Sequence, residues 1–291
     1  MEWILSIRSP QLTTFFQYIT WLGYRDFLFL FIPFCYWFLD RKVFGIFPLF
    51  VFISALINAY LKELFHDPRP DSVFNIDPWL DPLDPSFGFP SGHAQLAIVI
   101  WGFLMLRSQN TWIRSIFIFL ILTVSFSRLY LGVHDVIDII GGAIIGLISL
   151  LLLEQLLSEK GKWIRDLSSV KHFTIYIFFL ILLMFLWPTQ DGKIIVTGLG
   201  ALIIGFWLGN KLNDAFAQYE RPANIFLKLL SSLFAVIGFI ILNDKLEHLF
   251  QLIQFSDHLE TGISSLILGI YISFIAPTIL FYLRLQTKTK N

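Results

Sequence analysis

The sequence has few charged residues for its length. Asp, Glu, Lys and Arg make up 14% of the 291 residues, whereas soluble domains carry roughly 25%. Hydrophobic residues make up 56% of the chain, so the charged ones are too few to cover a water-facing surface. We therefore expect the chain to be embedded in a lipid bilayer. A formal net charge of zero gives no indication of a nucleic-acid partner.

Cysteine is also scarce, since Cys35 is the only one. A single cysteine excludes an intramolecular disulfide and a thiolate metal cluster, and we interpret Cys35 as a small apolar residue in a helix. The N-terminus has no basic segment followed by a small-residue cleavage site, so we expect the whole chain to be mature. The apolar runs are continuous rather than alternating, which argues against a membrane barrel.

Apolar runs of about 20 residues predict membrane-spanning helices. Residues 1–22 are either an interfacial amphipathic helix or a further span, and residues 245–261 are predicted as another interfacial helix. We divide the chain into a core at 1–158 and an additional transmembrane region at 159–291. The sequence thus predicts an all-α, polytopic transmembrane bundle of about nine spans, at 26–41, 43–64, 93–108, 112–131, 134–157, 173–190, 194–211, 224–243 and 262–284.

The basic residues predict an orientation in the membrane. The predicted spans place fourteen of the 21 Lys and Arg residues on one side and seven on the other. Because cytoplasmic loops carry an excess of these residues, the first side is expected to be cytoplasmic. The loop at 65–92 then faces the periplasm of a bacterial inner membrane or the lumen of an ER membrane. It holds six of the twelve prolines together with Asp71, Asp77, Asp81 and Asp84, and is either a shaped cap over a site or a solvated connector.

Ionisable residues at span ends form three groups, all on the predicted outer side. In the first, Lys62 lies near the end of a span, and Arg69 follows in an extended segment set by Pro68 and Pro70. Two cations suit a phosphate group, because Arg offers a planar fork of donors and Lys a point charge. Interfacial anchoring by basic residues is the alternative.

The second group is Pro90-Ser91-Gly92-His93, directly before an apolar run. Ser91 is a candidate N-cap, and Gly92 lets the backbone come close to a ligand. Free N–H groups at a helix start attract phosphate, and His93 would lie beside it. A capped helix whose histidine faces lipid headgroups is the alternative.

The third group is Ser127-Arg128 followed by His134 and Asp138. His134 and Asp138 are four residues apart and share one helical face. A carboxylate bound to one imidazole nitrogen fixes the tautomer and raises the basicity of the other nitrogen. Arg128 adds a third cation. A polar helix start with an incidental His/Asp pair is the alternative.

Taken together, the three groups predict phosphoryl transfer. His134, held by Asp138, is predicted to attack phosphorus, and His93 to protonate the leaving oxygen and then activate water. No metal or cofactor is expected, and the partner is a membrane lipid substrate. The residues predicted to bind the phosphate oxygens are Lys62, Arg69, Ser91, Gly92 and Arg128.

These residues resemble the type 2 phosphatidic acid phosphatase superfamily, whose signatures are K-x6-RP, PSGH and SR-x5-H-x3-D. The resemblance covers about residues 20–155, and no signature residue is missing. It implies an all-α membrane core and metal-independent hydrolysis, with the roles given above for His134 and His93. Members include lipid phosphate, lipid A, polyprenyl diphosphate and sphingosine-1-phosphate phosphatases, and glucose-6-phosphatase. The segment from Arg128 to His134 is most similar to the sphingosine-1-phosphate branch.

Three other functions stay open at this point. A soluble sugar phosphate could replace the lipid as substrate. A transporter or channel would have similar spans, but would bury its charges at the midplane rather than at one face. A metallohydrolase could use His93, His134 and Asp138 as ligands, although the three nearby cations would repel a metal ion.

Residues 160–291 carry no catalytic motif. His172, His248 and His258 are therefore interpreted as surface or interfacial residues. Glycine pairs four residues apart predict close helix packing within the chain, or alternatively a dimer contact. They are Gly142 with Gly146 and Gly205 with Gly209.

Overall fold

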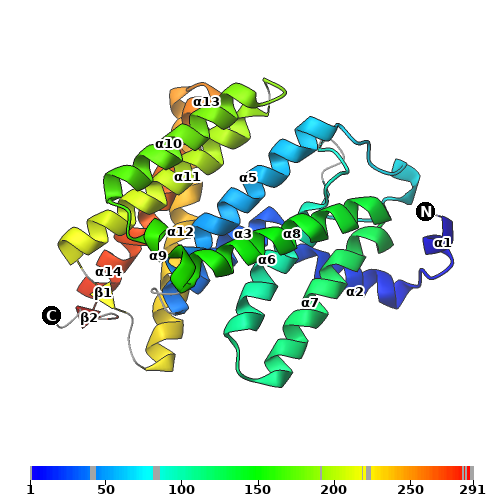
Figure 1. The fold of residues 1–291 in the computed structure, drawn as a ribbon, viewed down its shortest axis with the longest axis horizontal. Coiled ribbons are helices and arrows are strands. Elements are labelled where there is room, and N and C mark those ends of the chain that lie inside the picture. The colour runs from blue at the N-terminus through cyan, green and yellow to red at the C-terminus, as the bar shows by residue number, and fades with distance from the viewer. Residues whose placement is uncertain are drawn as a thin grey trace. The chain divides into compact units, whose positions relative to one another are not determined.

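The computed structural model describes residues 2–39, 44–80, 86–190, 192–217, 219–220, 224–283, 285 and 287–288. The described chain is helical almost throughout (Figure 1). Among these residues, the only strands are an antiparallel pair of two residues each, β1 (Tyr219–Glu220) and β2 (Thr287–Lys288). The prediction of an all-α fold is therefore confirmed.

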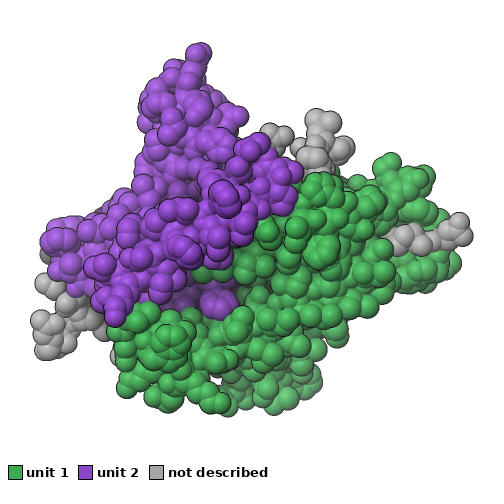
Figure 2. All heavy atoms as spheres, turned by 45° about the horizontal axis from the view of Figure 1, so that its top comes forward, with its two compact units in different colours: residues 1–28, 53–167 green, residues 29–52, 168–291 purple. Residues whose placement is uncertain are grey.

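The helices form two compact units (Figure 2). Unit 1 comprises residues 1–28 and 53–167, and unit 2 comprises residues 29–52 and 168–291. The sequence division at residue 158 stays a prediction. Helices α3 (Arg25–Phe38) and α5 (Phe47–Phe65) are shared between the units. Unit 1 also contains α1 (Glu2–Leu5), α2 (Pro10–Trp21), η1 (Ser72–Phe74), α6 (Gly92–Arg107), α7 (Thr111–Tyr130), α8 (Val136–Leu157), η2 (Glu159–Gly161) and α9 (Lys162–Arg165).

Unit 2 is built from long apolar helices. Its elements are α10 (Ser169–Leu186), α11 (Lys193–Leu212), η3 (Asn213–Ala217), α12 (Ile225–Ile253), α13 (Asp257–Ile270), η4 (Tyr271–Ile275) and α14 (Ala276–Tyr282). The segments η3 and η4 are π-helical turns. Since η4 precedes Pro277, whose ring nitrogen cannot donate, a wider turn there accommodates the missing hydrogen bond.

Within the described residues, seven helices are long and apolar enough to cross a membrane. They are α5, α7, α8, α10, α11 with η3, α12, and the run from α13 to α14. The other two predicted spans correspond to shorter helices, since α3 has 14 residues and α6 has 16. A total of nine spans stays a prediction. Residues 40, 41, 43 and 284 of the predicted spans lie outside the described residues, as do the counted basic residues Arg41, Lys42, Arg221, Arg284 and Lys290.

Two predictions about interfacial segments are affected. The break expected after residue 243 is wrong, because α12 continues through Asp244 and Lys245 and ends at the left-handed Gln254. These two charged side chains are exposed, and exposed charged residues do not interrupt a helix. Residues 245–261 are therefore not a single interfacial helix. At the N-terminus, α2 has 12 residues and is about 18 Å long, too short for a bilayer core of about 30 Å.

Helices α6 and α8 pack closely, and this contact supports the site described below. A Cβ atom on Gly142 would lie 2.3 Å from the carbonyl oxygen of Ser91, and one on Gly146 would lie 2.6 Å from that of Gln95. The backbones can therefore approach only because these positions have no side chain. The prediction that this glycine pair packs within the chain is confirmed.

A buried polar network fixes α6 against α5. The side-chain amide of Gln95 donates to the backbone oxygen and the hydroxyl of Ser54, both at 2.8 Å. Asn58 donates to the side-chain oxygen of Gln95 at 2.8 Å and to the carbonyl oxygen of Pro90 at 3.2 Å. Because buried polar groups are expensive to leave unpaired, this network specifies one register for the start of α6.

Candidate active site

His134 and Asp138 form a buried pair at the N-terminus of α8. The Nδ1 atom of His134 lies 3.0 Å from Oδ2 of Asp138, and both side chains are almost fully buried. The same carboxylate oxygen accepts from the backbone N–H of Asp135 at 3.0 Å, while the Asp135 side chain accepts from the N–H of Asp138 at 2.9 Å. This reciprocal capping box holds the carboxylate in place. Because the carboxylate engages Nδ1, the nitrogen of His134 that can react is Nε2.

The segment Pro90–His93 lies directly against this pair. The backbone N–H of Ser91 donates to the carbonyl oxygen of Asp138 at 3.0 Å. Ser91 occupies the N-cap position of α6, but its side chain makes no cap hydrogen bond. Its buried Oγ has no partner within the described residues. Gly92 follows at the first helical position, where an added Cβ would lie 3.0 Å from Oδ1 of Asn58.

His93 is held by residues of the N-terminal segment. Its ring meets the ring of Tyr24 edge to face, with centroids 4.7 Å apart and an angle of 82° between the planes. A Cβ on Gly23 would lie 2.3 Å from Cδ2 of His93, so the imidazole is packed against bare backbone. Its Nε2 atom is buried and has no partner in the described part of the chain. The ring therefore has one nitrogen available for chemistry.

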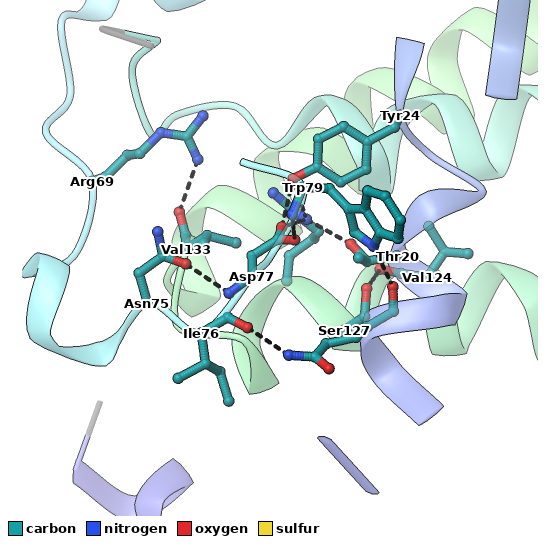
Figure 3. Close-up of polar contacts among 12 residues, drawn as sticks. Thr20, Tyr24, Arg69, Asn75, Ile76, Asp77, Trp79, Val124, Ser127 and Val133 are labelled. Atoms are coloured by element: carbon teal, nitrogen blue, oxygen red, sulfur yellow. Dashed lines mark hydrogen bonds and ion pairs between the residues drawn. The ribbon is translucent and has the colours of Figure 1, made fainter. Parts of the chain in front are cut away.

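Lys62 and Arg69 join the three segments through backbone carbonyls. Lys62 donates to the carbonyl oxygens of Phe87 and Gly88, two to three residues before Pro90. Arg69 donates to the carbonyl oxygen of Ser86 at 2.7 Å. It also donates to that of Val133 at 3.2 Å (Figure 3), and Val133 directly precedes His134 in the sequence. Both cations thus tie the loop before α6 to the site, in addition to any anion they bind.

Arg128 is almost fully buried and has a counter-ion. Its Nη1 atom lies 2.6 Å from Oδ2 of Asp77 and donates to the hydroxyl of Thr20 at 2.6 Å and of Tyr24 at 3.4 Å. Figure 3 shows Thr20, Tyr24 and Asp77 converging at this point. The Nε atom of Arg128 has no partner among the described residues.

The electrostatics of the site favour a neutral His134. Its pKa is well below the ordinary value of 6.5, first because the ring is buried, and then because of the positive charges of Lys62, Arg128 and Arg69. The ring of His93 also contributes in the same direction. The positive charges of Lys62, Arg128 and Arg69 thus act on His134 in the same direction as its burial.

Hydrogen bonds thus connect the segments that carry the eight residues predicted for the site. The structure also adds Thr20, Tyr24 and Asp77, which sequence analysis missed as site residues. A buried arginine requires a counter-ion. The acidic residues of the proline-rich loop, Asp77 among them, were therefore the sequence feature that could have indicated a partner for Arg128. Around Asp77 the loop is shaped rather than merely solvated, whereas Asp81 and Asp84 lie outside the described residues.

A helical bundle with seven helices of spanning length defines an integral membrane protein. The model of the PAP2 superfamily matches residues 44–162. Phosphatidylglycerophosphatase B of Bacillus subtilis is 32% identical over 173 residues, which cover 55% of this chain and 82% of that protein. The chain therefore belongs to the PAP2 superfamily.

Sphingosine-1-phosphate phosphatase 2 of Homo sapiens is 31% identical over 142 residues, covering 45% of this chain and 34% of that protein. The chain thus spans about a third of the length of that relative. Among solved structures, the crystal structure of Aquifex aeolicus LpxE matches with 25% identity and a TM-score of 0.44, covering 52% of this chain and 90% of that chain.

Proposed function

We propose that this chain is a membrane phosphatase that hydrolyses a lipid phosphate monoester or diphosphate through a phosphohistidine intermediate. One observation carries the proposal: His134 is bound through Nδ1 to Asp138, and hydrogen bonds join the segments of this pair to those of His93 and of three cations. Phosphoryl transfer needs a positioned nucleophile, an acid and concentrated positive charge, and this arrangement has all three.

In the first step, Nε2 of His134 attacks phosphorus and the bond from phosphorus to the lipid oxygen breaks. Asp138 accepts from Nδ1, which keeps the neutral tautomer with its lone pair on Nε2 and stabilises the ring as it becomes positive. His93 in its protonated form gives its proton to the leaving oxygen through Nε2. The lipid alcohol, or the lipid monophosphate for a diphosphate substrate, is the first product.

In the second step, His93 takes a proton from water, and the water oxygen attacks phosphorus. The bond between phosphorus and His134 breaks, inorganic phosphate is released, and both histidines return to their starting states. The non-bridging oxygens are bound by Arg128 through Nε, by the Ser91 hydroxyl, by Lys62 and Arg69, and by the free N–H groups at the start of α6.

The lipid class of the substrate is supported by the position of the site and by the relatives. The signature residues lie at the ends of apolar helices, where the phosphate of an amphiphile is found. The relatives include proteins named for sphingosine-1-phosphate, phosphatidylglycerophosphate and lipid A. The excess of Lys and Arg in the other loops favours a site on the periplasmic or lumenal face.

The proposal is tested by trapping the intermediate on purified protein. With a ³²P-labelled lipid phosphate, the wild type is expected to form an acid-labile, base-stable phosphoprotein. His134→Ala should lose both the label and turnover, by about 10³-fold or more in kcat, because the nucleophile is absent. His248→Ala is the matched control, since this exposed histidine contacts only Asp244 among the described residues.

Full turnover by His134→Ala would contradict the proposal. Transport of a substrate without hydrolysis would favour a transporter instead, and loss of activity in a chelator would favour a metallohydrolase. A panel of lysophosphatidate, sphingosine-1-phosphate, phosphatidylglycerophosphate, undecaprenyl diphosphate and a sugar phosphate decides the substrate class. We expect the lipids to exceed the sugar phosphate in kcat/KM, and the opposite order would assign a soluble substrate.

A further inference from the structure

The ion pair between Arg128 and Asp77 is buried, and it involves three separate segments of unit 1. Arg128 lies at the end of α7, Asp77 in the loop between α5 and α6, and Tyr24 in the turn after α2. The hydroxyl of Tyr24 donates to Oδ2 of Asp77 at 2.5 Å, the same oxygen that accepts from Arg128. Burial is the main cause that raises the pKa of Tyr24 above its ordinary value, so this hydroxyl stays a donor.

The loop presents Asp77 rigidly. The backbone N–H of Asp77 donates to Oδ1 of Asn75 at 2.9 Å, and Oδ1 of Asp77 accepts from the N–H of Trp79 at 3.1 Å. The indole N–H of Trp79 donates to the carbonyl oxygen of Gln17 at 2.9 Å, and the Gln17 amide donates to Ile76 at 3.0 Å. Both oxygens of the carboxylate are therefore engaged, and the loop is fastened to α2.

This arrangement fixes the direction of the guanidinium group. All the side-chain hydrogen bonds of Arg128 to described residues leave from Nη1, whereas Nε, on another edge of the planar group, has no partner there. An arginine held by one terminal nitrogen keeps another edge for an anion. The backbone carbonyl oxygen of Arg128 accepts from the N–H groups of Val133 at 3.1 Å and of His134 at 3.3 Å, so Arg128 adjoins the segment that carries the nucleophile.

Tyr24 extends the same arrangement to the second histidine. Its ring contacts His93 edge to face while its hydroxyl contacts Asp77. One side chain thus links the counter-ion of Arg128 to the orientation of His93. Tyr24 and Thr20 lie before residue 44, outside the segment matched by the family model.

Resting on the proposed function, we propose that Asp77 and Tyr24 are positioning residues, which turn Arg128 toward the phosphate and set the ring of His93. They do not touch the substrate and act through Arg128 and His93. The N-terminal segment and the proline-rich loop are then parts of the phosphate site and not merely connections between spans.

Vanadate binding to the purified full chain measures this role, because vanadate occupies a phosphate site without turnover. Asp77→Asn keeps the size and hydrogen-bonding oxygen of the side chain but removes its charge, and we expect at least tenfold weaker vanadate binding and a similar fall in kcat/KM. Tyr24→Phe keeps the ring against His93 and should weaken binding about threefold to tenfold. Asp71→Asn is the matched control, since Asp71 is exposed in the same loop and, among the described residues, its side chain only caps η1.

A double-mutant cycle separates positioning from charge. If Asp77 acts through Arg128, then Asp77→Asn in an Arg128→Ala background should change the vanadate Kd by less than twofold. Unchanged or tighter vanadate binding by Asp77→Asn alone would overturn the proposal, because a residue that only neutralises Arg128 opposes anion binding. Should Asp77→Asn fail to fold, Tyr24→Phe decides, and wild-type binding by that variant refutes the proposal.

Failure of the proposed function would look different. If the wild-type chain neither hydrolyses lipid phosphates nor binds vanadate, the proposed phosphate site, and with it the proposed function, is excluded. A wild type that does both, with Asp77→Asn indistinguishable from it, would leave the phosphatase standing and remove only the positioning role.

Discussion

Units 1 and 2 differ in what they bury. Among the described residues, every buried charged or imidazole side chain belongs to unit 1, namely Asp77, Arg128, His134 and Asp138. The buried polar side chains of unit 2 are Asn213 and the serines at 231, 232 and 273. Both units are otherwise apolar helical bundles of spanning length.

The two units differ in how their buried polar side chains are hydrogen-bonded. In unit 2, buried serines donate to the backbone of their own helical segment: Ser273 to Gly269 at 2.9 Å, and Ser231 to Lys228 at 2.9 Å. Such bonds satisfy a helix locally and need no other charge. Unit 1 instead buries the ion pair of Arg128 and Asp77, whose members lie 51 residues apart, and a buried charge of this kind is expensive and is the usual mark of a functional site.

The largest expected difference between the units comes from their histidines. His93→Ala in unit 1 should lower kcat by about 10²-fold to 10⁴-fold, because the acid and base of both steps is removed. His258→Ala in unit 2 should stay within twofold of the wild type, since this exposed ring contacts only Thr197 among the described residues. Steady-state hydrolysis of a lipid phosphate by the purified variants measures both.

The comparison fails if the two histidine variants lose activity equally. That result would place part of the catalytic machinery in unit 2. Labelled protein gives a further check, because loss of His93 slows release of phosphate from His134 and should let the phosphoprotein persist.

A smaller difference is expected from the glycines at close helix contacts. A Cβ on Gly142 would lie 2.3 Å from the Ser91 carbonyl oxygen, and one on Gly205 would lie 2.2 Å from that of Leu266. Each change to Ala should destabilise the protein by about 1–3 kcal/mol through overpacking. Only Gly142→Ala should also lower kcat/KM, by about tenfold, because it displaces the start of α6.

Thermal unfolding in detergent and kinetics on the folded fraction separate the two effects. Equal losses of activity in Gly142→Ala and Gly205→Ala would show that general destabilisation is responsible. Retained activity in Gly142→Ala would show that the α6–α8 contact does not set the site.

The smallest expected effect is on the pH dependence. The neutral form of His134 is the nucleophile, and a pKa well below 6.5 keeps it neutral as the pH falls through that value. The acid limb of kcat/KM should therefore lie below pH 6.5. With an unperturbed histidine as nucleophile, the enzyme would lose half of its kcat/KM at about pH 6.5. Among the charged residues, Lys62 lowers the pKa of His134 the most, so Lys62→Met should move the acid limb of kcat/KM to higher pH. A limb at pH 6.5 in both proteins would contradict this.

Much of the site could be predicted from residue order alone. The pair of His134 and Asp138 is local, because four residues make one helical turn, and Ser91 before an apolar run indicates a helix start. The apolar runs correctly predicted the helical class. The prediction that the helix ends at residue 243 was wrong, because Asp244 and Lys245 are exposed and α12 continues through them. Local patterns give the type of an element better than its ends.

The sequence alone therefore determined the membrane environment, the helical class and the candidate reactive groups, because these depend on composition and on spacing within one helix. Only tertiary structure decided that Asp77 and Tyr24 reach Arg128, and that Lys62 and Arg69 bind the backbone beside the histidines. The reason is physical. A buried charge selects its partner by distance in space, and segments separated by about 50 residues or more along the chain meet only when the helices pack.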